Sequence, residues 1–308
     1  MDRRTFLQTS GATALTAMLA RPLYAMPQDT KYMKNIGLQL WTVRNQMKDD
    51  EAGTLKAVAD AGYKQVELMK TLGSEKIVKT AKDVGMQVTS AFIEWTSLGK
   101  PDDKKAPEFD KILDQAKAFG LKHLVFGYIG KGERETVDHF KRHADQANKA
   151  GEKCAKAGIQ LCYHNHSFEF AKLNGGKTGW DVFVKEFDKK LVKFEVDVFW
   201  VKIGGLDPYK TLRQLKGRVS QVHLKDLVKG AKTQHDEGKV PHEAFKELGA
   251  GTIDMAKVMK ISAEIGAQQC HVEQDQSPAP LKSISTSIKH LQKLGSVSYT
   301  HLTLPTKA

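Results

Sequence analysis

Cysteine and long apolar segments are scarce in this chain. Its 308 residues contain three cysteines, Cys154, Cys162 and Cys270, an odd number at wide spacings, which argues against a disulfide framework and a zinc ribbon. No apolar run approaches the roughly 18–20 residues that span a bilayer, so we expect no membrane span. The length and the 40% of hydrophobic residues spread along the chain instead predict a folded protein with a substantial core.

Basic residues are in excess but they do not form a stripe. Lysine and arginine number 48 against 36 acidic residues, a formal net charge of +12. The tightest lysine groups, such as Lys104-Lys105 and Lys189-Lys190, are only pairs. This scatter favours an ordinary solvated surface, with attraction of an anionic small molecule as an alternative, and we expect no nucleic-acid partner.

The two ends of the chain differ from its middle. Arg3-Arg4-Thr5-Phe6-Leu7 and the short apolar stretch after it predict a twin-arginine signal peptide at residues 1–26, with a frayed basic N-terminus as the alternative. Such a signal exports folded proteins, so we expect a periplasmic or otherwise exported protein, often one with a metal or cofactor already loaded. Residues 296–308 are unrelated in character to the sequence before them, and we expect them to be a non-native tail. This leaves residues 27–295 as one domain.

A strand-helix rhythm repeats eight times between about residues 34 and 295. Each β-rich run is followed by a stretch with apolar residues three and four apart. This pattern predicts a single-domain α/β fold, the (β/α)8 TIM barrel; a doubly wound sheet is the alternative, but no G-x-G-x-x-G follows the first strand. The expected strands are Ile36–Val43, Gln65–Met69, Gln87–Ile93, His123–Ile129, Gln160–His166, Lys193–Phe199, Val219–Leu227 and Gln269–Asp275.

Imidazoles and carboxylates gather at the ends of the last four predicted strands. These ends read Tyr163-His164-Asn165-His166, Glu195-Val196-Asp197, Val222-His223-Leu224-Lys225-Asp226 and His271-Val272-Glu273-Gln274-Asp275. Neighbouring barrel strands can direct such groups to one point, and a mixed His/Asp/Glu shell suits Mn²⁺, Zn²⁺, Co²⁺ or Mg²⁺. Taken singly, each histidine could instead be a buried core group, and each acid could pair with Lys225 or Lys202.

These phrases resemble the sugar phosphate isomerase/epimerase superfamily, the xylose isomerase-like TIM barrels, to which the second family of AP endonucleases is related. The similarity extends over about residues 34–294. Multi-zinc AP endonucleases need further histidines on the third and fourth strands, which end here in Ala91-Phe92-Ile93-Glu94 and Phe126-Gly127-Tyr128. The resembling phrases are Gly37–Arg44, Gly62–Leu68, Tyr163–Glu169, Asp197–Trp200, Val222–Asp226 and Val272–Asp275.

The resemblance implies one divalent ion, most simply Mn²⁺, and a set of residues around it. Asp197, His223 and Glu273 would be ligands; the fifth strand offers His164 or His166 where sugar epimerases have a glutamate, and we take His164 as the ligand. Glu273 would move the proton, and Glu169 would act on the other oxygen or face. The substrate-binding candidates are His166, Trp200, Lys225, Glu67 and Trp41.

The implied activity is isomerisation or epimerisation of a keto-sugar through an enediolate. Two alternatives remain open: a 3-keto-glycoside lyase or hydrolase that uses the same site, and a non-catalytic sugar-binding barrel. The partner would be a small sugar. Members of the superfamily are often dimers or tetramers, although nothing in the sequence identifies an interface. The long segment from Lys229 to Gly249 is expected to be a lid, or else a disordered insertion.

Overall fold

The computed structural model describes residues 32–100 and 102–296. The expected signal peptide at residues 1–26 lies outside the described residues, and so does the expected tail from residue 297 onward.

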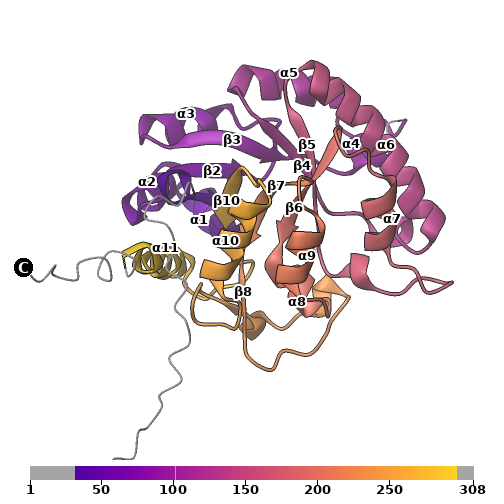
Figure 1. The fold of residues 1–308 in the computed structure, drawn as a ribbon. Helices are drawn as coiled ribbons and strands as arrows, with labels where there is room; N and C mark the ends of the chain where they lie inside the picture. Colours follow the sequence, from indigo (N-terminus) through magenta and orange to yellow (C-terminus); the bar gives the residue numbers. More distant parts are fainter. Residues whose placement is uncertain (1–31, 101, 297–308) are drawn as a thin grey trace, which may run out of the picture.

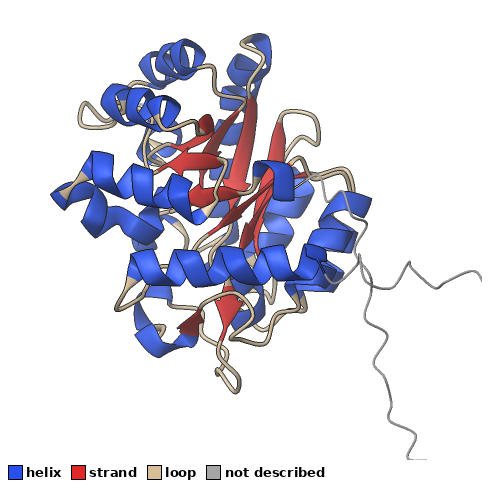
Figure 2. Ribbon diagram, turned by 90° about the vertical axis from the view of Figure 1, so that its left-hand side faces the viewer, coloured by secondary structure: helices blue, strands red, loops and turns tan. Residues whose placement is uncertain are grey.

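Eight parallel strands of the described chain close into a barrel with helices around it (Figures 1 and 2). The neighbour order β1-β10-β7-β6-β5-β4-β3-β2 closes the ring, which confirms the predicted TIM barrel and excludes the open sheet. A separate antiparallel pair joins β8 (Asp226–Leu227) to β9 (Phe245–Lys246). The barrel strands are β1 (Gly37–Gln39), β2 (Gln65–Leu68), β3 (Gln87–Phe92), β4 (His123–Phe126), β5 (Gln160–His164), β6 (Val192–Asp197), β7 (Val219–Leu224) and β10 (Gln269–Val272).

The helices bury one apolar face against the outside of the barrel, and this layer contains most of the hydrophobic core. In α5, for example, Ile112, Leu113 and Ala116 are buried at helical spacing. The helices are α1 (Arg44–Asp49), α2 (Glu51–Ala61), α3 (Glu75–Asp83), α4 (Thr96–Gly99), α5 (Phe109–Phe119), α6 (Val137–Lys156), α7 (Gly179–Glu186), α8 (Val198–Ile203), α9 (Pro208–Gln214), α10 (Met255–Glu264) and α11 (Pro280–Ser296). Short 3₁₀ turns are η1 (Met33–Asn35), η2 (Leu40–Val43), η3 (Lys131–Glu133), η4 (Phe168–Phe170), η5 (Glu237–Lys239) and η6 (His242–Ala244).

All eight barrel strands end before the position that their sequence pattern indicates, and in two of them a polar side chain ends the strand. Gln39 accepts a hydrogen bond from the backbone N–H of Trp41, and the chain turns into η2 instead of continuing as a strand to Val43. Asp197 accepts from the N–H groups of Phe199 and Trp200 and caps α8. The expected strand through Phe199 therefore stops at Asp197, at the mouth of the barrel.

The interior of the barrel is polar near this mouth, where many TIM barrels have apolar layers. The ladder register places His164 beside Glu195, Asp197 beside His223, and His223 beside His271. All five side chains are buried. The strand order therefore assembles a group of ionisable side chains that lie far apart in sequence.

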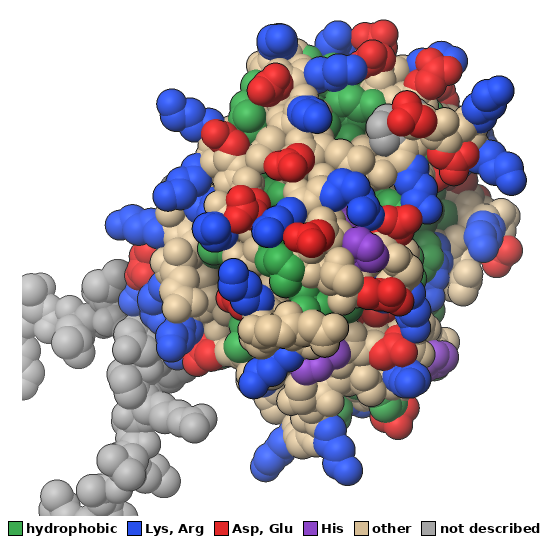
Figure 3. All heavy atoms as spheres, turned by 90° about the vertical axis from the view of Figure 1, so that its right-hand side faces the viewer, with side chains coloured by type: hydrophobic (Ala, Val, Ile, Leu, Met, Phe, Trp, Pro, Cys, Tyr) green, Lys and Arg blue, Asp and Glu red, His purple; other side chains and the backbone are tan. Residues whose placement is uncertain are grey.

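The outer surface carries both signs of charge. Lysine, arginine, aspartate and glutamate are interspersed on the face shown in Figure 3. Many of the ion pairs, such as Lys56 with Asp60 and Lys79 with Asp83, are exposed and lie one helical turn apart. Among the described residues, the longest helices are too polar to cross a membrane.

Candidate active site

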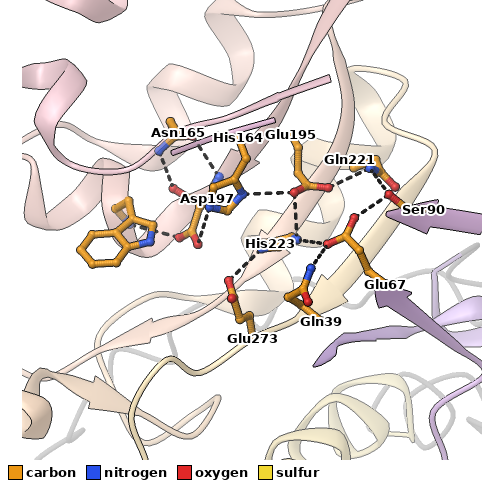
Figure 4. A network of polar contacts seen from close by, with 12 residues as sticks. Gln39, Glu67, Ser90, His164, Asn165, Glu195, Asp197, Gln221, His223 and Glu273 are labelled. Atoms are coloured by element: carbon orange, nitrogen blue, oxygen red, sulfur yellow. Dashed lines mark hydrogen bonds and ion pairs between the residues drawn. The ribbon is translucent and has the colours of Figure 1, made fainter. Parts of the chain in front are cut away.

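Four buried side chains converge at the C-terminal mouth of the barrel, and we call them the ligand cluster: His164, Asp197, His223 and Glu273. Each offers a nitrogen or oxygen atom, and these atoms all lie within 4.8 Å of one another. They come from the ends of β5, β6, β7 and β10, which are consecutive around the barrel. The structure thus brings together the four residues that the sequence suggested as ligands (Figure 4).

A lysine lies among the acids of the cluster. Lys225 Nζ is 2.9 Å from Asp197 Oδ2, 2.7 Å from Glu273 Oε2 and 2.6 Å from Asp275 Oδ2. Burial alone would lower the pKa of Lys225, but these three acids hold it well above its usual value. Lys225 is therefore a permanent cation at this site.

A second layer of acids lies beneath the cluster, and sequence reasoning did not give Glu195 a role. Glu195 Oε1 is 3.1 Å from His164 Nδ1 and 3.0 Å from His223 Nε2. Glu67 Oε2 is 2.7 Å from His223 Nε2 and accepts a hydrogen bond from Gln39. Glu195 stands two residues before Asp197, so the same period-2 spacing that paired other residues could have identified it.

The two histidines of the cluster have opposite tendencies to ionise. Burial holds the pKa of His164 well below its usual value, so its ring is neutral. Burial acts in the same direction on His223, but Glu195 and Glu67 outweigh it and raise its pKa well above the usual value. In the absence of another cation, His223 balances part of the buried negative charge.

Asn165 fixes the position of Asp197. Its side-chain oxygen accepts from the backbone N–H of Asp197 at 3.0 Å, and its amide donates to the Asp197 carbonyl oxygen at 3.3 Å. Burial raises the pKa of Asp197, although Lys225 opposes that shift. This fully buried amide joins the ends of β5 and β6 and sets the place of one candidate ligand.

The donor set of the cluster is suited to a divalent cation. It offers two imidazoles and two carboxylates, the ligand types that Mn²⁺, Zn²⁺ and Co²⁺ accept. Three carboxylates surround the ammonium group of Lys225: the buried Asp197 and Glu273 and the partly exposed Asp275. Because buried charge without compensation is costly, a further cation at this point would be stabilised.

A cavity of about 810 Å³ opens above the cluster. Trp200 lies in its wall, and its buried indole N–H has no hydrogen-bond partner among the described residues, so it can donate to a ligand. Trp41 and Tyr128 are about half exposed in the same wall. The other lining residues include Gln39, Phe92, Trp95, Lys131, His164, His166, Glu237, His242, Phe245, Glu273 and Asp275.

Three of the residues expected to contact substrate lie outside the cavity wall. Lys225 is one of them, because it is fully buried among the acids around the ligand cluster. The Glu169 carboxylate accepts from the Tyr163 hydroxyl at 2.6 Å and from the backbone N–H of His166, and it is not part of the cavity wall. Burial raises its pKa to about 8. Glu67 lies beneath His223, also outside the wall. The two glutamates differ from the expectation because hydrogen bonds in the barrel interior turn their carboxylates away from the opening.

The segment from Lys229 to Gly249 is ordered and covers one side of the cavity. Glu237 from this segment forms a nearly buried ion pair with Arg134 at 2.7 Å, and Asp236 pairs with Lys131. Asp226 accepts from the backbone N–H groups of Gly249 and Gly251 and so fixes the end of the segment. The segment is therefore an ordered part of the cavity wall and not a disordered insertion.

Comparison with protein families matches residues 55–294 to a family model described as the xylose isomerase-like TIM barrel. The chain belongs to the xylose isomerase-like TIM barrel family. The match covers all the barrel strands except β1, so the four positions of the ligand cluster lie within it.

Similar proteins in this family carry more than one kind of name. An inosose dehydratase of Clostridium botulinum is 27% identical over 263 residues, which cover 77% of this chain and 86% of that protein. A sugar phosphate isomerase/epimerase from Parabacteroides distasonis has a TM-score of 0.66 at 24% identity, over 84% of this chain and 93% of that one. The IolI protein, solved with a bound zinc atom, has a TM-score of 0.65 at 13% identity, over 86% and 99%. These structural similarities establish the shared fold.

Proposed function

We propose that this chain is a divalent-metal-dependent enzyme that removes the proton beside the carbonyl group of a keto-sugar or keto-cyclitol and then eliminates a substituent from the next carbon. The observation that carries the proposal is the position of Glu273. Its carboxylate belongs to the ligand cluster and also lines the cavity. The inosose dehydratase relatives, which match about three-quarters of the chain, support elimination as the outcome.

The ligand cluster would hold the ion through His164, Asp197, His223 and Glu273. A divalent cation at that place would polarise the substrate's carbonyl oxygen and stabilise negative charge as it develops there. Lys225, within 3 Å of two of these carboxylates, adds a fixed positive charge on the same side.

The proton transfers require a base and an acid. Burial raises the pKa of Glu273, but Lys225 and His223 outweigh it and lower the pKa to about 2, so this carboxylate is ionised and can accept the C–H proton. The electron pair of that bond forms the enolate and then expels the oxygen substituent on the neighbouring carbon. Asp275 lines the cavity, and burial raises its pKa to about 6, so it can hold a proton for the departing oxygen.

The position of Glu169 favours elimination over two-base epimerisation. Epimerisation through an enediolate needs a proton donor on the face opposite the base. The fifth strand brings His164 and His166 to the cavity, while Glu169 is held behind it by Tyr163. Burial lowers the pKa of His166 to about 4, so its ring is neutral at pH 7 and holds no acidic proton for that face.

An isomerase is the second candidate, because a single base can move a proton between neighbouring carbons on one face. Glu273 alone suffices for that reaction. A keto-glycoside lyase is a variant of the first proposal in which the leaving oxygen is glycosidic. The half-exposed Trp41 and Tyr128 in the outer cavity wall leave space for a group beyond the reacting ring.

The test is incubation of Mn²⁺-loaded protein in D₂O with a keto-cyclitol, a ketose or a 3-keto-glycoside. Elimination predicts an unsaturated ketone together with water, or with the released aglycone. Solvent deuterium at carbon without elimination would instead establish the isomerase. D197N and E273Q should lose turnover, and D197N should also lose bound metal; full turnover in both variants would refute the site.

Export is a further part of the proposal. The twin-arginine pattern at Arg3-Arg4 would direct the folded, metal-loaded protein out of the cytoplasm. Replacing both arginines by lysine should leave the protein in the cytoplasmic fraction, whereas unchanged export of that variant would contradict this assignment.

A further inference from the structure

We propose that Glu195 is a positioning residue: its Oε1 atom accepts a hydrogen bond from His164 Nδ1 and lies at ion-pair distance from His223 Nε2, and it thereby turns the Nε2 atom of His164 toward the ion-binding position. This inference rests on the proposed function, since it concerns the same site. It assigns a role to a residue that touches neither the cavity nor the ion-binding position.

The Oε1 atom of Glu195 lies between the two histidine rings of the ligand cluster. The atom lies 3.1 Å from His164 Nδ1 and 3.0 Å from His223 Nε2, so a single oxygen contacts different nitrogens of the two rings (Figure 4). A carboxylate oxygen has lone pairs for more than one donor. Both contacts therefore can be present together.

The nitrogens left over are the ones that face the cluster. His164 Nε2 lies 3.9 Å from Asp197 Oδ2, and His223 Nδ1 lies 2.9 Å from Glu273 Oε2. A metal-binding nitrogen must be free of its proton, so the ring must carry its proton on the other nitrogen. Glu195 thus favours the Nδ1–H tautomer of His164. At His223, Glu195 shares the contact with Nε2 with Glu67, whose Oε2 lies 2.7 Å away.

Glu195 itself is held in place from the other side. Gln221 donates to Glu195 Oε2 at 2.7 Å and to Ser90 Oγ at 3.0 Å, and Ser90 donates to Glu67 at 2.6 Å. Each of these side chains is fully buried, so water does not replace a lost contact. The network gives the carboxylate one orientation, which is the requirement for a positioning role.

The contacts of Glu67 set its role apart from that of Glu195. Among the described residues, Glu67 forms polar contacts with His223, Gln39 and Ser90 and none with His164. Loss of Glu195 should therefore disturb both rings, with His164 losing its Nδ1 partner altogether. This makes the tautomer of His164 the specific readout for Glu195.

The experiment is ¹⁵N NMR of the imidazole nitrogens, with Zn²⁺ and without metal, in wild-type, E195Q and E195L proteins. Wild type should show His164 as the Nδ1–H tautomer even without metal. E195L should shift His164 toward Nε2–H and weaken Zn²⁺ binding, measured by chelator competition, by about ten- to hundred-fold. E195Q keeps an accepting oxygen and should retain the tautomer with a smaller loss of affinity.

Several results would overturn the inference. One is a wild-type His164 with its proton on Nε2, a measurement that requires no variant to fold. Another is an equal loss of affinity in E195Q and E195L, which would mean that charge and not position matters. D226N, which alters a buried acid without contact to either histidine, is the matched control and should leave tautomers and affinity unchanged. Absence of Zn²⁺ binding in wild type would refute the proposed function, while the metal-free spectra would still decide the role of Glu195.

Discussion

Lys225 and Asp197 form an ion pair with 2.9 Å between Nζ and Oδ2, and both side chains are completely buried. The same ammonium group contacts Glu273, so one cation touches two of the four members of the ligand cluster. Lysine and a divalent ion would thus share the same carboxylates. The charge of the lysine stabilises these carboxylates in the metal-free protein, and it would lie close to an ion held by the same carboxylates.

The first prediction concerns the removal of this charge. K225M should destabilise the metal-free protein by about 3–5 kcal/mol, because three carboxylates, two of them buried, lose their shared partner. Mn²⁺ should then raise the thermal midpoint of the variant more than that of wild type. Thermal unfolding with Mn²⁺ and with a chelator measures both effects. K202M, at a partly exposed lysine, is the control; a K225M protein as stable as wild type would contradict the prediction.

The second prediction concerns the unpartnered N–H group of Trp200. W200F keeps an aromatic wall but removes the donor, so we expect KM to rise by about ten-fold with little change in the thermal midpoint, as for loss of one hydrogen bond to substrate. Steady-state kinetics and thermal unfolding test it. W180F alters a buried tryptophan that is not part of the cavity wall and should leave KM unchanged. An unchanged KM in W200F would show that no substrate atom accepts from this group.

The third prediction follows from the raised pKa of Glu169. Burial raises this pKa from its ordinary value of 4.5 to about 8, so the folded protein binds a proton that the unfolded chain has released between these pH values. The resulting stabilisation is complete below pH 4.5 and is lost as pH rises through about 8, at up to about 1.4 kcal/mol per pH unit. E169Q, which cannot ionise, should lack this slope. Urea unfolding at several pH values measures it, and parallel curves for the two proteins would refute the assignment.

The fourth prediction concerns the expected lid. E237Q removes a nearly buried ion pair with Arg134, so hydrogen exchange in residues 229–249 should accelerate and KM should rise several-fold. D236N, which alters the more exposed pair with Lys131, should change exchange much less. Hydrogen exchange followed by mass spectrometry compares the two variants. Equal protection in E237Q and wild type would show that the ion pair does not hold the segment closed.

Much of this architecture could be predicted from the sequence. The alternation of β-rich runs and helical spacing gave the barrel, and the strand-end motifs pointed to His164, Asp197, His223 and Glu273. Period-2 alternation involves only residues that are close in the chain, so it can be recognised in a single sequence. The positions where β1 and β6 end could not be predicted from the sequence. Gln39 and Asp197 accept hydrogen bonds from nearby backbone N–H groups, and these hydrogen bonds end the two strands.

The orientation of individual carboxylates could not be predicted from the sequence. Glu169 follows β5 within a few residues, yet its hydrogen bond with Tyr163 turns it into the interior. The link between Glu195 and two histidines on other strands depends on the register of β5, β6 and β7. Such contacts depend on how side chains pack across the barrel. The spacing of residues along the chain does not determine them.

The pairing of β1 with β10 has a consequence for how the protein matures. Gly37 lies opposite His271, so the ring closes only when strands from the two ends of the barrel meet. Glu273 follows β10 directly and joins the other candidate ligands late in synthesis, after the ribosome has translated nearly the whole domain. A chain stalled before that point would present an incomplete coordination shell, so we expect ion capture to be post-translational.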